Sequence, residues 1–94
     1  MQLHPDVARR LLSASEAKRA EPRLLHLASR LTPREREILR LVGRGASNRD
    51  ISRSLQISEA TVKTHVAHLF DKLAARDRVH LVLMAQRLGA VDRT

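Results

Sequence analysis

The clearest pattern of apolar and polar positions in this chain lies in residues 59–73. Apolar side chains recur there at spacings of four, three and four residues, which is the period of an amphipathic helix. They are Val62, Val66, Leu69 and Leu73. The opposite face carries small, polar or basic side chains in its first two turns. A helix that packs by one side and inserts the other into a DNA major groove needs this arrangement.

A shorter helix is predicted directly before this one. Ser47 is a suitable N-cap, and Asp50 follows at the spacing of a capping box. Ile51 and Leu55 supply one apolar face, and residues 56–57 fit a tight turn. Ser58 then caps the long helix. The pattern of short helix, turn and long helix is that of a helix-turn-helix.

Residues 32–35 (Thr-Pro-Arg-Glu) signal an earlier helix start. Threonine caps, proline suits the first helical position, and the glutamate can reach back to the cap. We therefore interpret Glu35 and Glu37 as cap and ion-pair residues rather than as a catalytic acid and base. Glycine ends helices well, and Gly45 fits this end better than Gly43.

The last predicted helix begins after a cap at Asp77, ends at Gly89 and contains five consecutive apolar residues, 81–85. Five neighbours cannot all face one core. Exposed apolar surface of this kind often marks a contact with another chain. The alternative is that the amino-terminal segment of the same chain covers the second side. We expect a homodimer through this helix, with contacts at Leu81, Leu83, Met84 and Leu88.

The predicted fold is all-α: residues 1–30 form a linker helix and hinge, and residues 31–94 form the helical domain. Pro5 suits the first turn of the linker helix. Glu21-Pro22 interrupts the pattern, so residues 16–24 are interpreted as the hinge. A helical turn is expected at residues 23–30, with its leucines partly covered.

Composition supports a small helical bundle with a polyanionic partner. The 94 residues include one aromatic side chain, so the core must be aliphatic, and the net charge of +8 favours nucleic acid. The alternative is that the charge serves only solubility. The chain has no cysteine, no apolar run of membrane-spanning length and no signal-peptide core at its start. We expect a cytoplasmic protein without a membrane partner.

Several stretches match a known pattern at fixed spacing: LTPREREIL at 31–39, GASN at 45–48, ISEATVKTH at 57–65, KL at 72–73, and Arg78. Over residues 31 to about 91 the chain thus resembles the LuxR-type (GerE or FixJ-NarL) helix-turn-helix domain. The resemblance implies a four-helix domain whose third helix, about 59–73, enters the major groove. It also implies a transcription regulator that binds paired half-sites, often through a dimer contact on the fourth helix.

The stretch from Pro5 to Leu12 is similar to the linker helix that follows a receiver domain in response regulators of two-component systems. The receiver itself is absent from the sequence, so the chain is either a fragment or a domain that stands alone. RNA polymerase is a further partner that such a regulator could contact.

The resemblance implies roles for individual residues. Base-edge or nearby phosphate contacts fall to Lys63 and Thr64, and sugar-phosphate contacts to Ser58, Thr61, Asn48, His65 and Lys72. Ala67 departs from relatives that carry a longer polar or basic residue there, which leaves a methyl contact with thymine open. Asp71 would be repelled by phosphate, so the amino-terminal half of the helix should enter the groove. The alternative without a DNA role is that Lys63 and Thr64 are solvated surface side chains. In the same way, Ser58, Thr61 and Asn48 could be helix caps and nothing more.

Other classes of function have little support. His65 and His68 are spaced for metal binding on a helix, but no third ligand or HExxH pattern accompanies them, so neither a metal nor a cofactor is expected. No nucleophile-base pair or phosphate loop is visible, which argues against an enzyme. RNA binding would need aromatic side chains for stacking. The main alternative is a helical protein-interaction module that uses residues 81–85.

Overall fold

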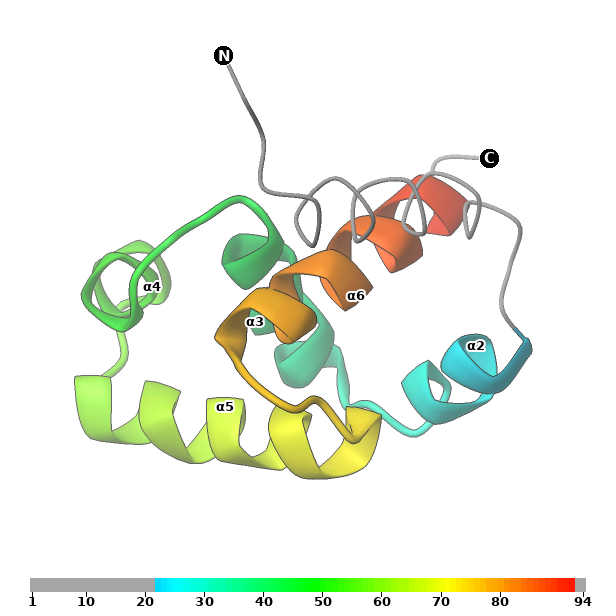
Figure 1. Ribbon diagram of the computed structural model, residues 1–94. Coiled ribbons are helices and arrows are strands. Elements are labelled where there is room, and N and C mark those ends of the chain that lie inside the picture. Colours follow the sequence, from blue (N-terminus) through cyan, green and yellow to red (C-terminus); the bar gives the residue numbers. More distant parts are fainter. Residues whose placement is uncertain (1–21, 93–94) are drawn as a thin grey trace, which may run out of the picture.

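Five helices account for most of residues 22–92, the part of the chain that the computed structural model describes, with side chains described as far as residue 89 (Figure 1). They are α2 (Pro22–Ala28), α3 (Pro33–Gly43), α4 (Asn48–Leu55), α5 (Glu59–Leu73) and α6 (Arg78–Asp92). No strand occurs in this range. The all-α prediction is confirmed, as is the helix-turn-helix formed by α4 and α5.

Reciprocal capping boxes begin α3 and α4, as the sequence predicts. Thr32 Oγ1 accepts a hydrogen bond from the Glu35 backbone at 3.1 Å, and Glu35 Oε1 accepts one from the Thr32 backbone at 2.8 Å. Ser47 and Asp50 make the same pair of contacts, both at 3.1 Å. Each box satisfies two backbone N–H groups that the helix leaves without a partner. At α6, Asp77 Oδ1 accepts from the His80 backbone at 2.7 Å, which confirms the predicted cap.

Three helices share the same type of carboxyl-terminal end, which contains a residue in the left-handed conformation. This residue is Gly45 after α3 (φ 88°), Gln56 after α4 (φ 55°) and Ala74 after α5 (φ 55°). The residue that follows each one donates its N–H to the carbonyl five residues earlier, at 3.1 Å in all three cases. This is the Schellman motif. Gly45 is therefore the terminating glycine, as predicted, whereas the other two helices end without glycine.

The core consists of aliphatic side chains drawn from all five helices. Its seven largest fully buried members are Ile38, Val42, Ile51, Val62, Leu69, Leu73 and Leu81. The single aromatic residue, Phe70, is only half-buried and packs against this cluster. None of the described helices combines the length and the apolar character that spanning a bilayer requires.

Helix α2 extends the packed structure further toward the amino terminus than the sequence suggested. Residues 22–24, predicted as part of a hinge, lie in a helix, because Pro22 occupies the first turn, where its missing N–H costs nothing. Leu24 and Ala28 are buried in the core, and Arg36 Nη2 donates to the Ala28 carbonyl oxygen at 2.7 Å. The predicted linker helix around Pro5 lies outside the described residues.

Gly43 allows α3 and α6 to approach closely. A Cβ atom added at Gly43 would lie 2.8 Å from the Cβ atom of Ala85, which is closer than side chains tolerate. Gln86 Nε2 also donates to the Gly43 carbonyl oxygen at 3.2 Å. The sequence suggested Gly43 only as a possible helix end, whereas in the structure it makes room for α6.

The predicted dimer contacts on α6 need correction. Leu81 is fully buried and Met84 and Leu88 are buried within the core of the same chain, so these three residues are not free to meet a partner. The reason is that α6 packs against both α2 and α3 and therefore buries a wide face. Of the four predicted contacts, only Leu83 is half-buried rather than buried.

The left-handed residue at the end of α5 leads to a prediction about stability. Ala74→Gly should raise the free energy of unfolding by about 0.5–1 kcal/mol, because it removes a Cβ atom that is unfavourable in the left-handed conformation. The larger conformational entropy of glycine in the unfolded chain cancels only part of this stabilisation. Ala74 is exposed, so no packing is lost. Urea denaturation followed by circular dichroism measures the difference.

The control is Ala67→Gly, an exposed alanine inside α5, which should lower the free energy of unfolding by about 1 kcal/mol. Equal destabilisation by both substitutions would contradict the expected relief of strain at Ala74.

Candidate nucleic-acid interface

Helix α5 has one buried and one exposed face, as its sequence pattern predicts. The four stripe residues at 62, 66, 69 and 73 are buried. The other face is exposed: Ala60, Thr61, Lys63, Thr64, Ala67, His68 and Asp71. In Figure 1, α5 runs along the lower edge of the molecule, and α3, α4 and α6 all lie on one side of it. The exposed face is therefore open to a partner as large as a DNA duplex.

The start of α5 offers donors for an anion. Ser58 Oγ accepts a hydrogen bond from the Thr61 backbone at 3.0 Å and lies 2.8 Å from Thr61 Oγ1. One hydroxyl proton joins the two oxygens, so the pair keeps a single hydroxyl donor for a bound group. The amino end of a helix also carries partial positive charge, which favours phosphate. Exposed Glu59 in the same turn opposes an anion on its own side.

Lys63 and Thr64 lie on the exposed face, but they differ in how free their polar groups are. Lys63 makes no hydrogen bond or ion pair within the described part of the chain, so its amino group is available. Thr64 Oγ1 donates to the Ala60 carbonyl oxygen at 3.1 Å. Its hydroxyl proton is thus engaged inside the helix, and the hydroxyl can act outward only as an acceptor.

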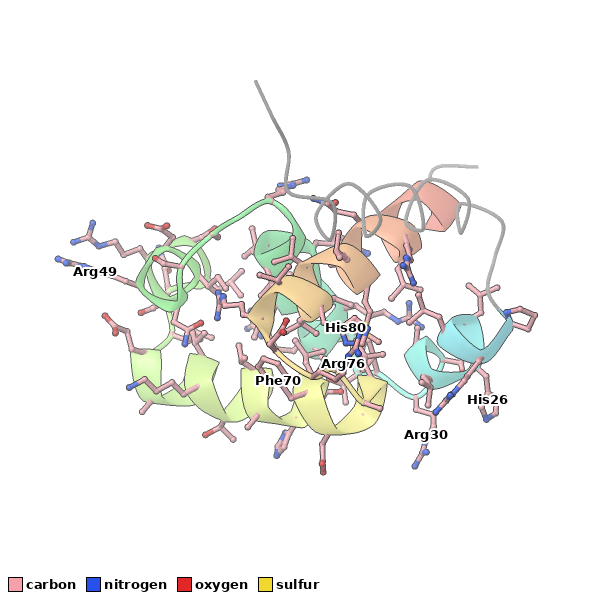
Figure 2. The ribbon with its side chains drawn as sticks, in the orientation of Figure 1. His26, Arg30, Arg49, Phe70, Arg76 and His80 are labelled. Atoms are coloured by element: carbon pink, nitrogen blue, oxygen red, sulfur yellow. The ribbon has the colours of Figure 1, made fainter. Side chains whose placement is uncertain are left out.

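Asn48, at the start of α4, uses its side-chain oxygen within the protein. Arg78 Nη1 donates to Asn48 Oδ1 at 2.9 Å, and Arg78 Nη2 donates to the Ala46 carbonyl oxygen at 2.8 Å. Arg78 therefore ties the start of α6 to the start of α4 and orients the Asn48 amide. Sequence reasoning missed an exposed cation beside it: Arg49, which projects away from α4 in Figure 2.

The two histidines of α5 occupy different surroundings. His65 is half-buried, and its Nδ1 atom is buried without a hydrogen-bond partner in the described residues, so this nitrogen does not face a ligand. His68 is exposed, and its Nδ1 lies 3.7 Å from Glu35 Oε2, which makes an ion pair only when the imidazole is protonated. Within residues 22–92 no three histidine or carboxylate side chains gather as a metal site would require.

Lys72 has an internal role that the sequence analysis did not foresee. Its Nζ atom lies 2.8 Å from Glu35 Oε1 and 3.4 Å from the Arg30 carbonyl oxygen. Glu35 is only 2% exposed, so this ion pair joins the buried start of α3 to the end of α5. The predicted phosphate contact of Lys72 stays a prediction, while the interpretation of Glu35 as a cap and ion-pair residue is confirmed.

Opposing effects act on the carboxyl group of Glu35. Burial raises its pKa, but hydrogen bonds from Lys72 and from the Thr32 backbone, together with the Lys72 charge, bring the pKa below its ordinary value of 4.5. The carboxylate is therefore charged at neutral pH. Because the pKa is lower in the folded state, its stabilising effect is present above pH 4.5 and is lost as the pH falls through the lowered pKa.

Comparison of the sequence with known proteins places this chain among bacterial regulatory proteins. The family model described as "Bacterial regulatory proteins, luxR family" matches residues 29–85. The nitrate/nitrite response regulator protein NarL of Escherichia coli is 49% identical over 51 residues, which cover 54% of this chain and 24% of NarL. The CsgBAC operon transcriptional regulatory protein of Escherichia coli is 54% identical over 55 residues, which cover 58% of this chain and 26% of that protein.

A third relative matches more of the chain. The uncharacterized transcriptional regulatory protein YxjL of Bacillus subtilis is 37% identical over 85 residues, which cover 90% of this chain and 39% of YxjL. The chain thus spans less than half the length of each of these three curated relatives.

The Glu35–Lys72 pair leads to a prediction about folding. Lys72→Met should lower the free energy of unfolding at pH 7 by about 2–4 kcal/mol, because it leaves a buried carboxylate without its cation. The difference from the unchanged protein should shrink as the pH falls, because without the Lys72 charge burial raises the pKa of Glu35, so that its carboxyl group becomes protonated and uncharged at a higher pH in the variant. Thermal and urea unfolding at several pH values measure both effects.

Lys63→Met is the matched control, since Lys63 is exposed and unpaired among the described residues. It should change the free energy of unfolding by less than about 0.5 kcal/mol. If the two lysine variants were equally stable at pH 7, the ion pair would not have the structural role assigned to it.

Proposed function

Because the chain belongs to the luxR family of bacterial regulatory proteins, we propose that it binds specific sequences of double-stranded DNA, with α5 in the major groove, and so regulates transcription. The observation that carries the proposal is the exposed face of α5. It combines a free lysine with small side chains and has no bulky apolar group in its first two turns. An α-helix with such a face fits the width of the major groove.

Phosphate contacts set the register of the helix in the groove. The hydroxyl pair of Ser58 and Thr61 and the amino end of α5 meet one strand, and the amide nitrogen of Asn48 and the Arg49 guanidinium meet phosphate beside α4. His65 makes a weaker backbone contact from the side of the helix. These contacts depend on charge and would weaken as salt concentration rises.

Base contacts come from the middle of the exposed face. The Lys63 amino group reaches an acceptor on a base edge, and Thr64 and Ala67 approach neighbouring bases. Asp71, one turn beyond Ala67 on the same face, keeps the carboxyl end of α5 away from phosphate. The amino-terminal half of α5 is therefore the part that enters the groove.

A homodimer through α6 would present two such helices to paired half-sites. The supporting surface is a helical stripe of Val79, Val82 and Leu83. Val79 is 55% exposed and is the one large apolar side chain that stands out as exposed in the described part of the chain. This stripe takes the place of the buried residues that the sequence analysis assigned to the interface.

The similarity to NarL supports a further proposal about the whole protein. The matched region is a quarter of that response regulator, and we propose that the present domain is likewise the output unit of a two-component regulator that acts on DNA in the cytoplasm. The alternative, a helical module that binds only protein, would show no affinity for any duplex even at low salt.

The role of Lys63 can be tested by substitution. Lys63→Ala should weaken binding to a duplex selected from a random pool by about 1–3 kcal/mol, roughly 5- to 150-fold, because a base-edge contact is lost. Fluorescence anisotropy at two salt concentrations measures the affinity.

The control is Arg23→Ala, which removes one exposed positive charge from α2, beside the carboxyl end of α5 (Figure 1). It should change the affinity less than threefold, because a distant exposed charge is largely screened by salt. Equal losses in both variants would mean that Lys63 contributes only general charge.

Dimer formation can be tested at the α6 stripe. Val79→Glu or Leu83→Glu should shift the protein toward monomer in analytical ultracentrifugation, because a charge would be buried at the contact. His26→Glu introduces the same charge on α2, where the side chain points away from the bundle (Figure 2), and should leave association unchanged. A protein that is monomeric with and without DNA before any substitution would exclude this interface.

A further inference from the structure

A line of methyl groups runs along the centre of the exposed face of α5. Ala60, Thr64 and Ala67 follow one another at spacings of four and three residues, so they lie on one side of the helix, and all three are exposed. At a rise of 1.5 Å per residue, the line from Ala60 to Ala67 is about 10 Å long, close to three base-pair steps of 3.4 Å. Lys63 flanks this line on one side.

These three side chains present no hydrogen-bond donor to a partner. The two alanines have no polar atom, and the hydroxyl of Thr64 already donates to the Ala60 carbonyl oxygen at 3.1 Å. What Thr64 keeps for a partner is its methyl group and the two acceptor lone pairs of the hydroxyl oxygen. The line therefore cannot make the paired hydrogen bonds by which arginine, asparagine or glutamine side chains recognise guanine and adenine.

The major groove contains one apolar group, the 5-methyl group of thymine. We propose that Ala60, Thr64 and Ala67 read thymine methyl groups, so that the half-site carries thymines opposite this line and, beside them, a base with an acceptor for Lys63. The inference rests on the proposed function and names the base chemistry of that site. Specificity at these positions then comes from burying methyl against methyl, a weaker and shorter-range signal than a bidentate hydrogen bond.

The position of Asp71 limits the length of this reading. It is exposed on the same side of α5, four residues beyond Ala67, and its carboxylate is repelled by phosphate. The methyl line thus ends where the helix leaves the groove, and the thymines should fall within about three to four consecutive base pairs.

Replacing thymine by uracil removes only the 5-methyl group, so it tests this reading directly. The probe is a duplex recovered by selection from a random pool, with each thymine of the half-site replaced by uracil in turn. Removal of one buried methyl group should weaken binding about fourfold at the contacted thymines, since a methylene group contributes about 0.8 kcal/mol. Uracil at thymines outside the half-sites is the control and should leave the affinity unchanged.

A pair of variants at one position separates methyl from hydroxyl. Thr64→Ser keeps the hydroxyl and its bond to the Ala60 carbonyl but removes the methyl, so one thymine should lose its sensitivity to uracil. Thr64→Val keeps the methyl and removes the hydroxyl, so the same sensitivity should remain. Circular dichroism establishes that both variants keep the helical fold.

Each outcome separates this inference from the function it rests on. If the protein binds a selected duplex tightly and no uracil within the half-site matters, the methyl reading is overturned while DNA binding stands. Loss of uracil sensitivity in Thr64→Val, with retention in Thr64→Ser, would also overturn it, because the hydroxyl would then be the reading group. If no duplex is bound even at low salt, the proposed function itself fails.

Discussion

The attachment of α5 to the bundle by four aliphatic side chains is the contact on which the rest of the structure depends. These side chains occupy about one side of the helix, and their burial fixes which residues face outward. A shift of the helix by one residue would rotate it by about 100° and expose apolar groups to water. The free position of Lys63 is therefore a consequence of packing on the opposite side of α5.

Polar contacts at the two ends of the helix-turn-helix complete this attachment. At the carboxyl end of α5, Lys72 meets the buried carboxylate of Glu35, which also caps α3. At the amino end of α4, Arg78 joins α6 to Asn48 and the Ala46 carbonyl. A buried ion pair adds little net stability over an apolar pair, but its geometry favours one arrangement of the helices. We infer that these links set the angle of α5 more than they strengthen the core.

Much of the fold could be predicted from the sequence because its signals are local. Capping boxes and the stripe of α5 depend on residues within one or two turns, so Thr32, Ser47 and Ser58 mark their helices correctly. Contacts between distant residues leave no such signal. The sequence could not tell that Lys72 would meet Glu35, thirty-seven positions away, or that Gly43 would make room for Ala85. On α6, five consecutive residues are apolar, so their sequence alone could not show which of them would be buried in the core.

For the candidate site, too, features set by local sequence could be predicted and features set by distant contacts could not. The exposed side of α5 could be predicted, since periodicity alone separates it from the buried stripe. The state of individual polar groups was not predicted. The Thr64 hydroxyl bonds to the carbonyl four residues earlier, which is a local option for threonine in any helix, whereas the Asn48 oxygen meets Arg78, thirty positions away, and burial of the His65 Nδ1 atom depends on the tertiary fold. Arg49 could have been identified from the sequence, because it lies in the first turn after the helix cap Ser47. It is one of eighteen lysine and arginine residues, however, and nothing else in the sequence distinguishes it.

The separation of the two faces of α5 has a consequence for how such a domain diverges. Apart from His68, which lies 3.7 Å from Glu35, the exposed residues on its outer side make no hydrogen bond or ion pair to another described helix. They can therefore mutate without unfolding the protein, provided that the replacement tolerates a helical backbone. Duplicated copies of the gene could therefore acquire new target sites by a few substitutions, while the interior is inherited unchanged. The same independence makes α5 a practical place to redirect the domain to a chosen sequence in the laboratory.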